Sequence, residues 1–326
     1  MEIIPYTKHC IGQEEEAAVL EVLRSDYLTN GPKVEEFENK FRDYIGCKYA
    51  IAVSSCSAAL YLAGLAHEFN KMEEMDYRSF SKRRISTSPL TYVATVNAVV
   101  LSGGDPCFFD IDKDTWLSKD VMVPVHYAGI TDRFPNAIIE DAAHSCGAEI
   151  DGKKVGAKRT CCFSFHPAKN MTTGEGGMVT TDNEEVAIKI KRMRQNGIEK
   201  DGFNQRMIDF GFKFNMNEIQ AAIGIIQLSK LGGMNAKRKR IYERYKDELN
   251  GPVGFQKIPE CVKPSHHIIP VLVENRDKML VRLRSNGIIS AIHYYPVHLM
   301  PYYQQKYGHK KGDFPNAEYV GNHTLS

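Results

Sequence analysis

The chain has 326 residues and a formal net charge of +2, with 43% hydrophobic and 25% charged residues. This length suits two domains, and the apolar share is sufficient for a sizeable core. The near-balanced charge argues against a protein that binds nucleic acid through a basic surface, and no apolar run approaches the 18 residues expected of a helix that spans a membrane.

The first two-thirds of the chain alternates helical and strand-like patterns. Helices are predicted over residues 12–25, 33–46, 56–69, 183–197 and 215–231, and strands over residues 49–54, 85–90, 105–112, 121–127, 136–142, 161–166 and 177–181. Most of the strands are short continuous apolar runs, as is typical of a sheet covered on both faces. This alternation predicts an α/β fold with a mostly parallel sheet.

The last third has a different pattern. A Gly-Gly pair at Gly232 and Gly233 is read as a break before a polar helix, and the domain boundary is placed there, giving domains over residues 1–232 and 233–326. Strands over 267–273 and 289–295 flank a helix over 275–287. This order predicts a smaller α+β domain at the C-terminal end.

The eight cysteines include no Cys-x-x-Cys pair, so no metal site is expected. Several lie in apolar runs, which is typical of buried reduced thiols. The N-terminal stretch, MEIIPYTKHC, lacks the pattern of a signal peptide. These features favour a cytoplasmic protein.

Four polar features follow predicted strands, where ligands gather in open α/β sheets. Ser57 lies at the start of a helix whose unpaired amides suit a phosphate, although an ordinary serine cap gives the same pattern. Asp141 ends an apolar strand, with His144 one turn later, where it could pair with a cationic ring nitrogen or simply cap a helix. Tyr92 could stack on a planar ring or pack in the core.

The fourth feature is Lys169 in the stretch FSFHPAKNMTTGEGGMVTT. A lysine beside glycines that allow close approach can form an imine with an aldehyde, although the glycines alone indicate only a tight turn. Each feature is weak by itself. An anion cradle, a strand-end carboxylate, an aromatic face and a lysine together match the groups that bind pyridoxal phosphate.

The chain also resembles the DegT/StrS-type sugar aminotransferases, of the fold-type I aspartate aminotransferase superfamily. The resemblance covers nearly the whole chain and is carried by LTNGPKVEEFENKF, AIAVSSCSAALYLA, IIEDAAHSCGA, GFKFNMNEIQAAIG, HYYPVH and, most specifically, SFHPAKNMTTGEGG. It implies a three-layer α/β/α large domain, a smaller α+β domain and pyridoxal 5'-phosphate as cofactor.

Roles carried over from this family fall on specific positions. The resemblance makes Lys169 the Schiff-base lysine and general base, and Asp141 the partner of the pyridine nitrogen. It implies contacts from His144 to the ring hydroxyl, from Tyr92 by stacking, and from Ser57, the Ala58 amide and Ser164 to the phosphate. It also implies a phosphate contact by Asn215 or Lys213 of a neighbouring subunit, hence a homodimer with active sites at the interface. Substrate contacts are expected at four further positions, namely Tyr27, Thr29, Tyr294 and His298.

The expected reaction moves an amino group from glutamate to a nucleotide-linked keto-sugar, with a 4-keto-6-deoxy sugar preferred. Lys169 favours transamination, since some relatives with histidine at this place are dehydratases. Alternatives are a 3-keto-sugar, a carbocyclic ketone, or a catalytically idle regulatory protein that binds the cofactor. The chain departs from the family in having Cys56 where glycine is usual and in ending at GNHTLS, where relatives continue by about one helix. The small domain is therefore expected to be compact or truncated at its end.

Overall fold

The computed structural model describes residues 3–76, 79–249 and 251–326. Its central sheet has the strand order β1-β10-β9-β6, formed by β1 (Tyr49–Val53), β10 (Gly177–Thr181), β9 (Thr160–Ser164) and β6 (Ile139–Asp141). Single bridges extend this sheet from Asp141 to Val125 and from Val123 to Thr87, and so reach the parallel pair of β4 (Arg84–Thr87) and β5 (Asp105–Phe108). Only β10 pairs antiparallel with both of its neighbours in the sheet. The predicted mostly parallel sheet is confirmed.

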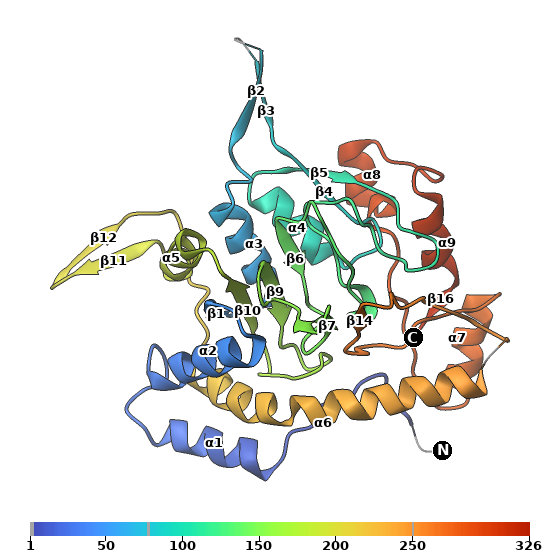
Figure 1. Cartoon of the computed structure of the whole chain (residues 1–326), viewed down its shortest axis with the longest axis horizontal. Helices are drawn as coiled ribbons and strands as arrows, with labels where there is room; N and C mark the ends of the chain where they lie inside the picture. The colour runs from blue at the N-terminus through green and yellow to red at the C-terminus, as the bar shows by residue number, and fades with distance from the viewer. Residues whose placement is uncertain (1–2, 77–78, 250) are drawn as a thin grey trace.

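Helices cover both faces of the sheet (Figure 1). Alternate residues of each strand point to opposite faces, so β1 sends Ile51 and Val53 into one core and Ala50 and Ala52 into another. The first core packs against α3 (Cys56–Ala66), α4 (Val93–Leu101) and α5 (Glu184–Met193), and the second against α2 (Pro32–Ile45) and α6 (Glu218–Glu248). Two buried layers on one sheet make the three-layer fold that the sequence predicts.

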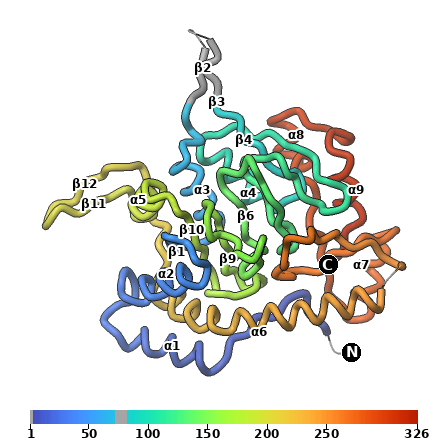
Figure 2. The backbone as a smooth tube through the Cα atoms, viewed as in Figure 1, coloured from blue at the N-terminus to red at the C-terminus, as the bar shows by residue number. Residues whose placement is uncertain are grey.

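The remaining elements lie at the edges of these layers (Figures 1 and 2). Helix α1 (Gln13–Leu23) packs on α6, and the hairpin of β11 (Ile198–Asp201) and β12 (Asn204–Met207) projects away from the body of the protein. The C-terminal third contributes α7 (Arg276–Ser285), α8 (Pro301–Tyr307) and α9 (Pro315–His323). The short strands are β2 (Met72–Asp76), β3 (Ser79–Lys82), β7 (Glu149–Ile150), β8 (Lys153–Lys154), β13 (Gly254–Phe255), β14 (Val262–Lys263), β15 (Val271–Leu272) and β16 (Thr324–Leu325).

The predicted helix break at Gly232 and Gly233 is wrong, because α6 runs unbroken through both residues. Asn217 caps its start together with Gln220, and Leu228 and Leu231 bury one face just before the glycines. Two glycines cost a helix about 1 kcal/mol each, and this packing outweighs that cost. The boundary between residues 232 and 233 would thus fall inside a helix, and the division into two domains stays a prediction.

Two predicted strands are not formed as such within the described residues. Residues 121–127 pair with their neighbours only through single bridges at Val123 and Val125. Residues 289–295 form no strand, because their backbone groups pair with two separate ends of the chain: Ile289 donates to the carbonyl of Ile4, and Ala291 exchanges hydrogen bonds with Ser326. This segment therefore ties both ends of the chain together and places Tyr294 beside His144.

Candidate active site

A cavity of about 510 Å³ lies where β6 and β9 end and α3 and α4 begin. It brings together seven of the residues that the sequence predicts as site residues, although they come from all parts of the chain. These seven are Ser57, Tyr92, Asp141, His144, Ser164, Lys169 and Tyr294. The position agrees with the general rule that ligands bind at the carboxyl ends of strands in open α/β sheets.

Lys169 lies in the loop between β9 and β10, beneath the cavity. Its amide donates to the carbonyl of His166 at 2.8 Å, which closes a tight turn. Arg238 of α6 holds this loop in place, because its guanidinium donates hydrogen bonds to the carbonyl oxygens of Lys169 and Asn170, each at 3.4 Å. Burial lowers the pKa of the Lys169 amine below its usual value, against the opposing effects of Cys56 and Asp141. A neutral amine is the form that can act as a nucleophile or a base.

Asp141 presents its carboxylate to the cavity from the end of β6. Its Oδ2 accepts a hydrogen bond of 2.6 Å from the hydroxyl of Thr95, and its Oδ1 accepts one of 3.1 Å from the amide of Ala143. These donors hold the side chain in one orientation. Each oxygen retains a free lone pair, so the carboxylate can still accept a proton donor from a ligand.

The neighbouring carboxylate of Glu140 serves a different purpose. It lies 3.2 Å from the Nε2 of His126 and 3.7 Å from the Nη1 of Arg159, and it does not line the cavity. Burial tends to raise the pKa of Glu140, but the hydrogen bond from His126 and the other polar contacts hold it below its usual value. Successive strand residues thus point to opposite faces here, and only Asp141 is available to a ligand.

The start of α3 forms the other wall of the cavity. Ser55 caps the helix by accepting the Ala58 amide at 3.1 Å, so Ala58 serves the cap, whereas Cys56 and Ser57 lie in the first turn, where amides have no acceptor within the helix. Gly177 of β10 packs directly on this turn. A Cβ at position 177 would lie 2.5 Å from the carbonyl carbon of Ser55 and 2.7 Å from the nitrogen of Cys56.

His144 and Tyr294 join the two halves of the chain across the cavity. The Ala128 amide donates to the Nδ1 of His144 at 3.3 Å, which places the imidazole proton on Nε2, 2.9 Å from the hydroxyl oxygen of Tyr294. Burial lowers the pKa of His144 well below its ordinary value and raises the pKa of Tyr294 well above its own. Tyr294 therefore keeps its proton and can donate it into the cavity. Tyr92 is exposed, with its ring centroid 6.0 Å from that of Tyr294.

Several cavity residues are missing from the sequence prediction. They are Tyr6, Thr91, His166, Glu175, His267 and His293. His267 has its ring 4.4 Å from that of His144, and its buried Nδ1 has no partner among the described residues. His267 lies outside the quoted motifs and gave no signal of this proximity, whereas His166 and His293 lie inside the quoted stretches SFHPAKNMTTGEGG and HYYPVH but were assigned no role.

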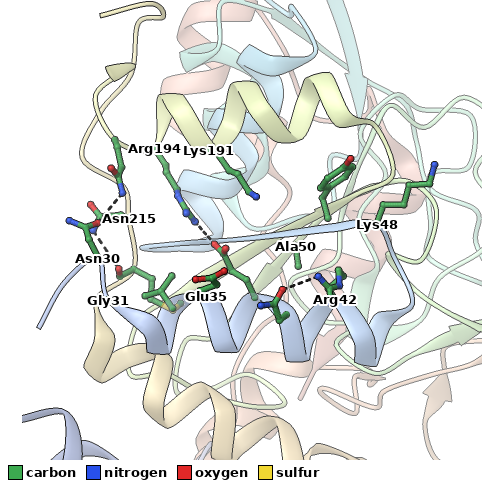
Figure 3. Close-up of a pocket in the computed structure, with 15 residues that line it drawn as sticks. Asn30, Gly31, Glu35, Arg42, Lys48, Ala50, Lys191, Arg194 and Asn215 are labelled. Atoms are coloured by element: carbon green, nitrogen blue, oxygen red, sulfur yellow. Dashed lines mark hydrogen bonds and ion pairs between the residues drawn. The ribbon is translucent and has the colours of Figure 1, made fainter. Parts of the chain in front are cut away.

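Five predicted residues lie away from this cavity. His298 is fully buried, and its Nε2 lies 3.0 Å from the Oε1 of Glu318. The other four, Tyr27, Thr29, Lys213 and Asn215, belong to one stretch of surface in which Thr29 bridges to Asn217 and Lys213 bridges to Gln195. Asn215 lines a second pocket of about 350 Å³ together with Asn30 and Arg194 (Figure 3).

The cavity residues fit pyridoxal phosphate. A buried lysine and a strand-end carboxylate open into one space. The glycine at position 177 lets β10 pack closely on the first turn of α3 without displacing its main chain, and at this turn an anion is stabilised by free amides and the helix dipole. The fold and this set of groups define a pyridoxal phosphate-dependent enzyme of fold type I.

The sequence model of the DegT/DnrJ/EryC1/StrS aminotransferase family matches residues 9–326, so the chain belongs to this family and is an aminotransferase. It is 39% identical to the uncharacterized protein MJ1066 of Methanocaldococcus jannaschii, over 99% of this chain and 92% of that protein. It is 34% identical to the spore coat polysaccharide biosynthesis protein SpsC of Bacillus subtilis, over 99% of this chain and 91% of that protein.

Solved structures show the same fold over the whole chain. Helicobacter pylori PseC, an aminotransferase involved in the biosynthesis of pseudoaminic acid, superposes with a TM-score of 0.90 at 28% identity, covering 100% of this chain and 93% of that one. DesV of S. venezuelae, solved in complex with a ketimine intermediate, gives a TM-score of 0.88 at 27% identity, covering 96% and 88%. The predicted family, fold class and cofactor are confirmed. No helix among the described residues is long and apolar enough to cross a membrane.

Proposed function

We propose that the protein transfers the amino group of glutamate to a nucleotide-linked keto-sugar, with a 4-keto-6-deoxy sugar as the preferred acceptor. The single observation that carries this proposal is the convergence of Lys169, Asp141 and the start of α3 on one cavity. The relatives support the substrate class, because SpsC is named for polysaccharide biosynthesis and PseC is described as an aminotransferase in the biosynthesis of pseudoaminic acid.

Each cavity residue then has a defined task. Bound pyridoxal phosphate supplies an electron sink for negative charge that develops at the substrate carbon. The Nζ of Lys169 would hold the aldehyde carbon of the cofactor, and as a free amine it would carry a proton between the donor carbon and a position two atoms away. Asp141 holds the proton of the ring nitrogen, and the first turn of α3, with Ser57 and Ser164, receives the phosphate.

The test of this proposal compares Lys169→Ala with the unaltered enzyme. The variant is expected to lose the visible absorption band of the bound cofactor and all turnover with glutamate and keto-sugars. A panel of nucleotide-linked 4-keto and 3-keto sugars and a carbocyclic ketone, with labelled glutamate as donor, identifies the acceptor. Retained turnover in Lys169→Ala contradicts the role of this lysine, and a bound cofactor that glutamate never bleaches contradicts transamination itself.

We further propose that the working unit is a homodimer. The predicted site residues that miss the cavity, Tyr27, Thr29, Lys213 and Asn215, share one surface, where Phe210 and other large apolar side chains are also exposed. A second copy seated on this surface would cover the apolar side chains and bring these four residues to the cavity of its partner. A monomeric mass in sedimentation of the active enzyme contradicts this arrangement, and Phe210→Asp is expected to dissociate the dimer and to lower activity.

A further inference from the structure

The hydroxyls of Thr91 and Thr95 lead from the start of α4 to the carboxylate of Asp141. The Oγ1 atoms of Thr91 and Thr95 are 2.8 Å apart, and the Oγ1 of Thr95 is 2.6 Å from the Oδ2 of Asp141. All three side chains are buried, with 1%, 1% and 6% of their surface exposed. Thr95 lies in α4, whose apolar sequence gives no sign of function, and Thr91 directly precedes the N-cap residue of this helix. The roles proposed above do not use Thr95.

The direction of these hydrogen bonds follows from the chemistry of the groups. An ionised carboxylate only accepts, so Thr95 donates its single proton to Asp141. The oxygen of Thr95 is then an acceptor, and Thr91 donates to it. The length of 2.6 Å is typical of a hydroxyl bound to a charged oxygen. Thr95 also lies 3.2 Å from the carbonyl of Tyr92, but the shorter and charge-assisted contact takes the proton.

This chain of donors holds the Asp141 carboxylate in one orientation and fixes which of its lone pairs stays free for a ligand. We infer that Thr95 is a positioning residue which, through Asp141, keeps a proton on the ring nitrogen of the cofactor. The inference rests on the role proposed above for Asp141. Tyr92 is the N-cap of α4. The first turn of this helix would therefore orient two groups, the tyrosine that stacks on the cofactor ring and the carboxylate of Asp141 that holds the ring nitrogen.

The experiment replaces the hydroxyl of Thr95 by a methyl group in Thr95→Val and restores it in Thr95→Ser. Thr87→Val is the matched control, because the Thr87 hydroxyl is equally buried but donates to the main-chain oxygen of Val123 at 2.8 Å. Each protein is loaded with pyridoxal phosphate, and the pH midpoint of its visible absorption, its affinity for the cofactor and its kcat are measured. Asp141→Asn is measured alongside.

Thr95→Val is expected to move the absorption midpoint to higher pH. A cofactor ring with less positive charge withdraws less electron density from the group that titrates, and this group then binds its proton more tightly. The kcat of Thr95→Val is expected to fall by about ten- to hundred-fold, which corresponds to the loss of one hydrogen bond to a charged group. Thr95→Ser is expected to restore both values, and Thr87→Val to lower only the stability. If Thr95→Val does not fold, Thr91→Val is expected to shift the midpoint in the same direction by a smaller amount.

An unchanged midpoint and kcat in Thr95→Val, or an equal shift in Thr87→Val, overturns the inference while the proposed aminotransfer stands. Likewise, an unchanged midpoint in Thr91→Val overturns it when Thr95→Val is unfolded. If Asp141→Asn itself keeps the midpoint and kcat of the unaltered enzyme, the proposed role of Asp141 is wrong, and the inference about Thr95 falls with it.

Discussion

Replacing Gly177 by alanine tests whether the start of α3 is the cradle for the cofactor phosphate. Gly177 lies between Val53 of β1 and Ser164 of β9, and an added Cβ would meet the Ser55 carbonyl carbon at 2.5 Å and its oxygen at 2.6 Å. Carbon atoms in ordinary contact lie about 3.5–4.0 Å apart. The overlap is therefore about 1 Å, and it falls on main-chain atoms, which cannot rotate away as a side chain can.

The magnitude follows from this overlap. Overpacking of this kind costs about 1–3 kcal/mol, so the free energy of unfolding of Gly177→Ala is expected to fall by that amount. Because the displaced atoms open α3, the same strain falls on the phosphate contacts. The dissociation constant for pyridoxal phosphate is expected to rise by about five- to hundred-fold, which corresponds to a similar free energy.

Urea unfolding of the cofactor-free protein and a spectroscopic titration with pyridoxal phosphate measure the two quantities separately. Gly232→Ala is the matched control, because a Cβ at this helical position meets nothing within 4 Å. This control is expected to gain about 0.5–1 kcal/mol of stability and to bind the cofactor normally. If Gly177→Ala loses stability but keeps the affinity for the cofactor, the first turn of α3 is not the cradle.

Three further predictions concern the histidines and their partners. His298→Gln is expected to lower the free energy of unfolding by about 1–3 kcal/mol, because Glu318 loses a buried partner, while the KM for the keto substrate stays unchanged; a raised KM would instead place His298 in substrate binding. Burial lowers the pKa of His293 to about 4, whereas its ordinary value is about 6.5. Between about pH 6.5 and pH 4 the unfolded chain therefore binds more protons than the folded protein, and the free energy of unfolding falls as the pH drops. This histidine alone contributes about 2 kcal/mol of that loss by pH 5, so His293→Gln is expected to flatten the dependence measured by urea unfolding, and an unchanged slope would show that His293 does not titrate in this way. Tyr294→Phe leaves the Nε2 proton of His144 without its acceptor, so kcat/KM is expected to fall by about ten-fold; an unchanged value would mean that the 2.9 Å contact has no part in turnover.

The sequence predicts those parts of the site that sit where a regular pattern stops. Asp141 ends an apolar strand, and Ser57 lies where a strand gives way to a helix, so their common location follows from the parallel sheet, whereas Ser164 is predicted only through the family resemblance. Thr95 shows why other parts escape prediction. It is one polar side chain in an apolar helix, which is common and indicates no function. Its contact with Asp141 becomes visible only when α4 is packed beside the end of β6.

The same contrast applies to the C-terminal third. The pair Gly232 and Gly233 has the composition of a break, yet the helix continues because its neighbours are already packed on the sheet. His267 lies in no quoted motif, and it reaches the cavity only through tertiary folding. His298, expected near the substrate, is instead held in the interior by Glu318.

The two carboxylates at the end of β6 show how a register decides chemistry. Glu140 pairs in the sheet with Cys161 and Asp141 with Cys162, and these two cysteines belong to the two opposite cores. A shift by one residue would exchange the faces of the two acids. Glu140 would then lose its contacts with His126 and with the Arg159 guanidinium, which compensate its burial, and Asp141 would lose the neutral donors that orient it. The cation-paired carboxylate is thus placed for stability, and the carboxylate that only neutral groups hold is left with its charge available to a cationic ring.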